Sequence, residues 1–82
     1  MNEQNVDQDV TIYTTPTCPY CNAAKDYFEE NGISFTDYDV SENRKKAKEM
    51  IEKSGQRGTP VIDIDGEIVV GFNKEKIQSL LN

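Results

Sequence analysis

The residues best suited to chemistry in this sequence are Cys18 and Cys21, which stand three positions apart in the run Cys-Pro-Tyr-Cys. Residues at this spacing on a helix share one face and rise by about 4.5 Å, so their sulfurs can form and break a disulfide with little backbone movement. The chain has no histidine, which excludes an imidazole base and any zinc site that uses histidine. The spacing therefore predicts thiol-disulfide chemistry.

The position of each cysteine predicts its role. Cys18 is expected at the N-terminus of a helix, where unpaired N–H groups and the helix dipole favour a thiolate, so it is the expected nucleophile. Cys21, one turn further and on the packed face, is expected to resolve the mixed disulfide. Two other interpretations are half of a zinc site and a pair of inert core thiols. The first lacks two ligands, and the second is uncommon for a pair at a helix start.

The pair must be held by the elements around it, and the sequence predicts seven, in the order β-α-β-α-β-β-α. Strands are expected at residues 10–14, 33–40, 60–64 and 67–70, and helices from Pro19 toward Asn31, at 42–53 and after Asn73. Ser41 and Asn73 are the expected caps of the later helices, and Asp65-Gly66 predicts a hairpin. This order indicates an α/β fold with one mixed, four-stranded sheet and helices on both faces.

Length and charge narrow the possible partners. The 82 residues suffice for one small domain, expected at 10–82 after a flexible tail at 1–9. The net charge of −6 has the wrong sign for binding nucleic acid or an anionic membrane. The charge is uneven: residues 1–42 hold nine acids and one base, net −8, and residues 43–82 hold six acids and eight bases, net +2. An anionic ligand is therefore expected to prefer the second half.

The compartment follows from the same composition. The longest apolar stretch, Ile68–Phe72, is too short to cross a bilayer. Two cysteines three residues apart do not make the disulfide framework of a small secreted protein. We therefore expect the chain in the cytoplasm.

Three motifs together resemble one known family. Cys-Pro-Tyr-Cys at a strand-to-helix junction, Gly58-Thr59-Pro60 before the third strand and Gly71-Phe72 before the last helix resemble the glutaredoxins, within the thioredoxin-like fold. The resemblance covers about residues 10–81. It implies a cis Thr59-Pro60 bond, with the Thr59 backbone facing the disulfide. The glutathione-binding residues that it implies are Thr15, Tyr20, Arg57, Thr59, Pro60, Gly71, Phe72, Asn73 and Lys74.

The sequence departs from glutaredoxins at one of these positions and in one of these segments. Thr15 stands where the family usually has a lysine three residues before the first cysteine, whereas Arg57 matches the basic or amide residue three before the proline. The run from Gly71 to Lys74 looks more like the ribonucleotide reductase redoxins, which draw electrons from thioredoxin reductase. The chain therefore combines an active-site motif that resembles the glutaredoxins with a loop that resembles the redoxins.

The predicted function is that of a monomeric, glutathione-dependent thiol-disulfide oxidoreductase that acts on protein disulfides and protein-glutathione mixed disulfides. Glutathione is the expected reducing co-substrate, and no metal or bound organic cofactor is expected. The first alternative is a redoxin with the same chemistry that is reduced by thioredoxin reductase and serves ribonucleotide reductase. Two further alternatives are a dimer that holds a glutathione-bridged iron-sulfur cluster and an adaptor with idle thiols.

Overall fold

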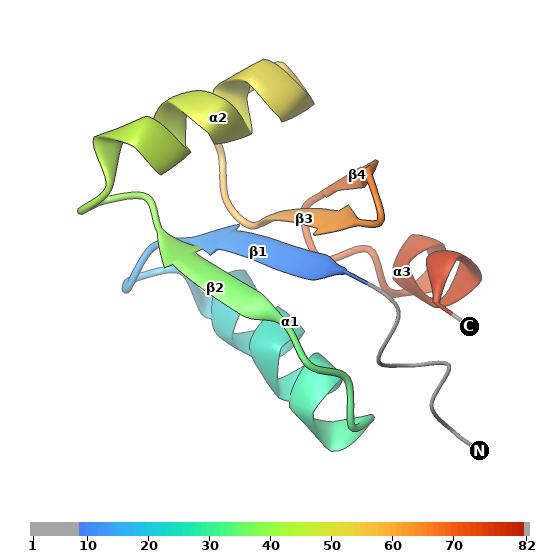
Figure 1. The fold of residues 1–82 in the computed structure, drawn as a ribbon. Coiled ribbons are helices and arrows are strands. Elements are labelled where there is room, and N and C mark those ends of the chain that lie inside the picture. Colours follow the sequence, from blue (N-terminus) through green and yellow to red (C-terminus); the bar gives the residue numbers. More distant parts are fainter. Residues whose placement is uncertain (1–8, 82) are drawn as a thin grey trace.

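The computed structural model describes residues 9–81, and Figure 1 shows their four strands and three helices in the predicted order. The strands are β1 (Val10–Thr14), β2 (Thr36–Asp39), β3 (Val61–Ile64) and β4 (Glu67–Val70), and the helices are α1 (Pro19–Glu30), α2 (Arg44–Ser54) and α3 (Lys74–Leu80). The strands form one mixed sheet in the order β2-β1-β3-β4. In it β1 runs parallel to β2 and antiparallel to β3, and β3 is antiparallel to β4.

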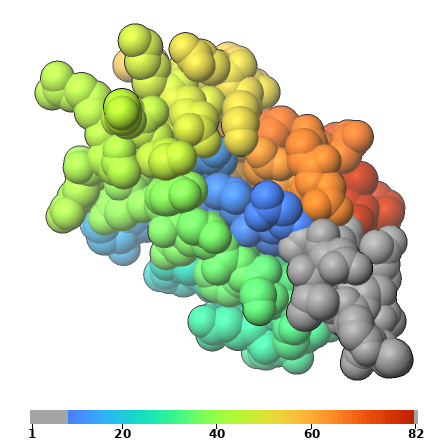
Figure 2. Space-filling model, in the orientation of Figure 1, coloured from blue at the N-terminus to red at the C-terminus, as the bar shows by residue number. Residues whose placement is uncertain are grey.

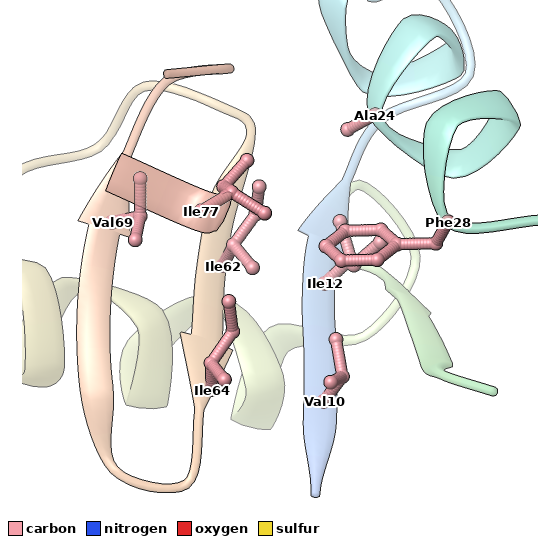
Figure 3. Packing of buried hydrophobic residues seen from close by; sticks show 8 residues of the cluster. All are labelled: Val10, Ile12, Ala24, Phe28, Ile62, Ile64, Val69 and Ile77. Carbon is pink, nitrogen blue, oxygen red and sulfur yellow. The ribbon is translucent and has the colours of Figure 1, made fainter. Parts of the chain in front are cut away.

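The core lies on both faces of this sheet, because side chains alternate along each strand. On one face, Ile12 of β1 belongs to a cluster with Phe28 of α1 and Ile77 of α3. Figure 3 shows Phe28 pointing from α1 toward β1. On the other face, Tyr13 of β1 packs with Met50 of α2. Helices α1 and α3 therefore cover one side of the sheet and α2 covers the other.

The hairpin between β3 and β4 forms at Asp65-Gly66, as predicted. Both residues have positive φ, 52° and 93°, which is the backbone that a two-residue hairpin turn of the primed type needs. The turn pairs Ile64 with Glu67 and Val61 with Val70, so β4 becomes an edge strand.

The prediction of Ser41 as a helix cap is wrong. Helix α2 begins at Arg44 with Asn43 as its N-cap, whose side-chain oxygen accepts the N–H of Lys46 at 3.1 Å. Ser41 instead donates its backbone N–H and its hydroxyl to the carboxylate of Asp39, at 2.9 and 2.5 Å. Because these bonds hold Ser41 in a turn, the helix starts two residues later than the sequence suggested.

Strand β2 is shorter than the expected strand at 33–40, but the predicted change of face within that segment is present. Ile33 and Phe35 precede the strand and pack against the cluster under α1 and α3. Tyr38 and Val40 pack against the cluster under α2. The ladder with β1 extends over only four residues of β2, so Ile33 and Phe35 pack their side chains without strand pairing.

The predicted tail, residues 1–9, lies outside the described residues except for Asp9. The N–H of Asp9 donates to the carboxylate of Asp65 at 2.8 Å, and the N–H of Asp65 donates to the Asp9 carbonyl at 2.9 Å. These bonds continue the pairing of β1 with β3 by one residue. Among residues 9–81, no helix has the length and apolar character needed to cross a bilayer.

A polar network fastens α2 to the sheet. The hydroxyl of buried Tyr13 donates to the carboxylate of Glu49, and Lys53 donates to that hydroxyl at 3.2 Å and to Asp63 at 2.7 Å. Asp63 also accepts the N–H of Gly66 at 2.7 Å, so its largely buried carboxylate supports the hairpin. The hydrogen bond to Asp63 raises the pKa of Lys53, which therefore stays charged in the network.

We predict that Lys53→Met lowers the free energy of unfolding by about 1–3 kcal/mol, because it leaves the largely buried carboxylate of Asp63 without its cation. Urea unfolding followed by circular dichroism measures this. The matched control is Lys48→Met on the same helix, which removes an exposed cation and should change the free energy by no more than about 0.5 kcal/mol. Equal, small effects of the two substitutions would contradict a stabilising role of the network.

Candidate functional site

Cys18 lies where the chain turns from β1 into α1, and it caps that helix. The turn is closed by the N–H of Cys18, which donates to the carbonyl of Thr15 at 3.3 Å, and Pro19 occupies the first helical position. The Sγ atom of Cys18 accepts the N–H of Cys21 at 3.1 Å, as a serine or aspartate oxygen does at other helix caps. The sulfur therefore faces the free N–H groups of the helix end.

The two thiols differ in access. Cys21 has an exposed fraction of 0% and shares the buried side of α1 with Ala24 and Phe28. Cys18 is half-buried, and the intervening Tyr20 is 68% exposed. A substrate can therefore reach Cys18 from solvent, whereas Cys21 can react only with a group that is already inside the site.

The surroundings of Cys18 lower the pKa of its thiol. Burial alone would raise this pKa, but it is outweighed by hydrogen bonds from the side chains of Cys21 and Thr59 and from the backbone at Cys21 and Tyr20. Such bonds stabilise the negative sulfur. Cys18 therefore has more thiolate at neutral pH than an ordinary cysteine, and the thiolate is the reactive form.

The surroundings of Cys21 act in the opposite direction. Burial raises the pKa of Cys21, and its hydrogen bond with Cys18 raises it further. The Thr15 backbone and the Thr59 side chain lower this pKa without reversing the shift. Cys21 consequently holds its proton more strongly than Cys18 does, which is the order that a nucleophile and a second, delayed thiol require.

Thr59 reaches the cysteines from the loop before β3. The Thr59-Pro60 bond is cis, as the resemblance implied, and the carbonyl of Thr59 lies 3.7 Å from the Cys18 sulfur, which donates to it when protonated. The carbonyl of buried Pro60 accepts the N–H of Gly71 at 2.9 Å. Gly71 has a φ of 81°, a conformation that other residues seldom adopt. The loop after β4 is thereby tied to the residues beside Cys18.

The three residues after Gly71 make two kinds of contact. Phe72 and Lys74 pack on Tyr27 of α1, and Asn73 caps α3. The ring of Phe72 lies 5.9 Å from the Tyr27 ring, and the ammonium of Lys74 lies 5.6 Å from the same ring centre. The side chain of Asn73 accepts the N–H of Lys76 at 3.2 Å and caps α3, as the sequence predicted. Sequence reasoning missed Tyr27, because nothing in the pattern of α1 signals contact with a loop so distant along the chain.

The other two predicted ligands differ in their surroundings. Thr15 is half-buried, and its backbone contacts both cysteines. Arg57 is exposed in the loop after α2 and makes no hydrogen bond or ion pair within residues 9–81. The structure therefore brings Thr15 and Thr59 to the sulfurs and leaves Arg57 unengaged.

The site thus consists of a cysteine that caps a helix and a neighbouring loop with a cis proline. A chain with this site and this order of strands and helices can be compared with known protein families. The family model for glutaredoxins matches residues 10–69, which include both cysteines and the cis proline. The chain belongs to the glutaredoxin family. The resemblance inferred from the three motifs is thus confirmed.

Individual glutaredoxin relatives support this assignment. The chain is 47% identical to an uncharacterised glutaredoxin-like protein of 8.6 kDa from the rubredoxin operon of Clostridium pasteurianum, over 88% of this chain and 96% of that protein. It is 41% identical to glutaredoxin 3 of Escherichia coli K12, over 77% of this chain and 76% of that protein.

A solved redoxin has the same fold. The structure of the NrdH-redoxin of E. coli, whose activity is described as thioredoxin-like, superposes with a TM-score of 0.80 at 28% identity and covers 90% of this chain and 96% of its own. The predicted thioredoxin-like fold is therefore confirmed. The chain is a thiol oxidoreductase of the glutaredoxin and thioredoxin type, similar both to proteins named glutaredoxins and to a redoxin.

We predict that Thr59→Val raises the pKa of Cys18, because it removes a hydroxyl that lowers this pKa while keeping the shape of the side chain. The pH dependence of Cys18 alkylation by iodoacetamide, with the modified residue assigned by mass spectrometry, should shift toward higher pH. The matched control is Thr17→Val, which changes an exposed threonine next to Cys18 and should leave the profile unchanged. Identical profiles for Thr59→Val and the wild-type protein would refute the contribution of the hydroxyl.

Proposed function

We propose that this chain is a glutathione-dependent thiol-disulfide oxidoreductase that reduces protein disulfides and protein-glutathione mixed disulfides. The observation that carries the proposal is the contrast between the thiols: Cys18 is reachable and its pKa is lowered, while Cys21 is fully buried and its pKa is raised. Membership of the glutaredoxin family supports the same reading.

The reaction consists of two thiol-disulfide exchanges. The Cys18 thiolate attacks one sulfur of the substrate disulfide, which forms a Cys18-substrate bond and releases the other sulfur as a thiolate that takes up a proton. Cys21 then loses its proton and attacks the Cys18 sulfur, which releases the second substrate thiol. The substrate gains two electrons, and the enzyme is left with a Cys18–Cys21 disulfide.

Two molecules of glutathione then restore the dithiol. The first forms a mixed disulfide with Cys18 and frees the Cys21 thiol, and the second attacks that mixed disulfide and leaves as oxidised glutathione. Electrons and protons balance without a metal or a bound organic cofactor, so glutathione is a co-substrate. A substrate that is itself a glutathione mixed disulfide needs only Cys18 and one glutathione, because Cys21 can be bypassed.

The proposed glutathione site surrounds Cys18. The proposed partner of the cysteinyl part is the backbone of Thr59, next to buried Pro60, and exposed Tyr20 and half-buried Thr15 border it. Arg57, which is exposed and free of ion pairs within the described part of the chain, is the proposed partner of a glutathione carboxylate.

The loop after β4 completes the proposed site. Gly71, Phe72, Asn73 and Lys74 are held near it through Pro60 and Tyr27, so their proposed role is to shape its far wall.

A second candidate function is that of a redoxin reduced by thioredoxin reductase and serving ribonucleotide reductase. The observations that favour it are Phe72, which is packed onto Tyr27 in the Gly-Phe loop, and the similarity to NrdH-redoxin. Thr15, in place of a lysine, also removes one cation that would attract glutathione. Both candidates use the same two exchanges at Cys18 and Cys21, and they differ in the reductant and in the protein that is served.

We further propose that the protein works as a monomer in the cytoplasm. The use of both cysteines as one redox pair, rather than as structural crosslinks, supports a compartment where thiols are kept reduced. The burial of both core clusters between the sheet and the chain's own helices supports the monomer. A dimer mass in analytical ultracentrifugation would overturn the proposal that the protein is a monomer.

We predict that Cys18→Ser lowers all turnover at least about 100-fold, because a serine hydroxyl is not ionised at neutral pH and cannot replace the thiolate. Cys21→Ser should keep the release of glutathione from a glutathionylated peptide and lose the reduction of insulin disulfides. Both reactions can be followed by NADPH consumption. Equal loss of both activities in Cys21→Ser would show that the assigned roles are wrong.

The two reductants are separated by coupling the protein to glutathione with glutathione reductase and, in a second assay, to thioredoxin reductase. We predict turnover in the first assay only, with Arg57→Ala raising the KM for glutathione because it removes the proposed carboxylate partner. Lys76→Ala, which removes an exposed cation from α3, is the matched control and should leave this KM unchanged. Turnover only with thioredoxin reductase would establish the redoxin function instead.

A further inference from the structure

The uneven charge along the sequence gives opposite net charges to α1 and α2, which lie on opposite faces of the sheet. Helix α1, on one face of the sheet, carries more acidic than basic residues: Asp26, Glu29 and Glu30 against Lys25. Helix α2, on the other face, carries a basic excess: Arg44, Lys45, Lys46, Lys48 and Lys53 against Glu49 and Glu52. A protein with a net charge of −6 therefore has one helix that is clearly positive.

Only part of this positive charge is used within the molecule. Lys46 pairs with Glu49 at 3.1 Å, and Lys53 pairs with Asp63 at 2.7 Å. Arg44, Lys45 and Lys48 are exposed and make no ion pair or side-chain hydrogen bond within residues 9–81. We call these three residues the α2 basic surface.

The neighbouring carboxylates do not neutralise the α2 basic surface. Lys45 and Lys48 line a shallow hollow of the surface together with Glu49 and Glu52. Glu49 is already engaged by Tyr13, Lys46 and Lys53. Among the lining residues, Glu52 is then the one carboxylate without a described partner, against the two free cations Lys45 and Lys48, while Arg44 lies outside the hollow.

Two of these cations, Arg44 and Lys45, occupy the first turn of α2, where they weaken their own helix. The first turn of α2 contains no acidic residue, although the helix dipole favours acids there by about 0.3–1 kcal/mol each. Arg44 and Lys48 are four residues apart, a spacing at which like charges repel. Residues that reduce the stability of their own helix are expected at binding sites, where they are kept for their contact with a ligand or partner.

The α2 basic surface lies at the same edge of the sheet as Cys18. Strands β1 and β2 are parallel, so both end at this edge, and the N–H of Val40 after β2 donates to the carbonyl of Thr14 at 2.9 Å. The chain leads from Thr14 to Cys18 and from Val40 to Arg44, over four residues in each case. Figure 1 shows α2 beginning beside the end of β2, and in Figure 2 side chains of this yellow-green segment project from the corner of the molecule.

We propose that the α2 basic surface docks an acidic segment of the protein whose disulfide Cys18 reduces. This inference rests on the proposed function and adds the chemistry of the preferred protein substrate. Three free cations match a short run of aspartate or glutamate. A long polyanion such as nucleic acid would also meet the acidic remainder of the molecule, which repels it. Attraction of this kind speeds encounter, so it raises kcat/KM and weakens with salt.

The test uses two glutathionylated peptides of the same sequence, one extended by four glutamates and the other by four lysines. The wild-type protein should deglutathionylate the acidic peptide with a kcat/KM roughly tenfold higher at low salt, and the preference should largely vanish at about 0.5 M NaCl. Equal kcat/KM values for the two peptides at low salt, or a preference that salt leaves unchanged, would overturn the docking proposal.

A charge-removing variant locates the effect. The triple change Arg44→Gln, Lys45→Gln and Lys48→Gln should abolish the preference. The control Lys76→Glu with Gln78→Glu alters the net charge by the same amount on α3 and should retain the preference. A preference that survives in the triple variant, or disappears equally in the control, would show that overall charge, and not this surface, is responsible.

Two further measurements distinguish a failure of the docking proposal from a failure of the proposed function and from misfolding of the variants. Turnover of the small neutral disulfide bis(2-hydroxyethyl) disulfide should be the same in the wild-type protein and both variants, because it makes no contact with the α2 basic surface. If the wild-type protein reduces neither this compound nor either peptide, the proposed function itself fails. The triple variant should also unfold at a temperature no lower than the wild-type protein, since it removes cations from the start of a helix.

Discussion

The antiparallel pairing of β1 with β3 is the constraint on which the active site depends. Its register places Tyr13 opposite Val61 and Ile12 opposite Ile62. Because β1 runs toward Cys18 and β3 runs away from Thr59, this register brings two residues that are 41 positions apart to a sulfur-oxygen distance of 3.7 Å. A slip of one residue would reverse the faces of β3 and remove Ile62 and Ile64 from the core beneath α1 and α3. Core packing thus also fixes the distance between the thiol and its partner.

The contrast between the two thiols arises from different balances of the same forces. Desolvation acts against the thiolate at both sulfurs, but only Cys18 receives enough hydrogen bonds to reverse its effect. The N–H of Cys21 donates to the Cys18 sulfur, so the backbone of the second cysteine helps to activate the first. A chain without histidine can in this way hold a reactive thiolate by means of a helix end and a neighbouring threonine.

Much of the fold was predictable because its signals are local. The Asp65-Gly66 turn, the proline after Cys18 and the cap at Asn73 each depend on a few adjacent residues. The cap of α2 was misplaced because Ser41 and Asn43 are both good caps, and only the competition of Asp39 for Ser41 decides between them.

In the candidate site too, local features could be predicted from the sequence and contacts between distant segments could not. The cysteine pair was evident from its spacing, whereas the contacts of Phe72 and Lys74 with Tyr27 depend on packing between α1 and the loop before α3. The network of Tyr13, Lys53 and Asp63 likewise joins β1, α2 and β3, so no local sequence pattern predicts it.

The direction of β1 has a consequence for how this protein can be joined to others. Val10 begins the strand at the edge where the β3–β4 hairpin turns, and Thr14 ends it at the edge of Cys18. Five strand residues separate these edges by about 16 Å. A protein or surface joined directly to Asp9, in place of residues 1–8, would therefore start beside the hairpin and at the opposite edge from Cys18, which leaves the face around Cys18 open to a folded protein substrate.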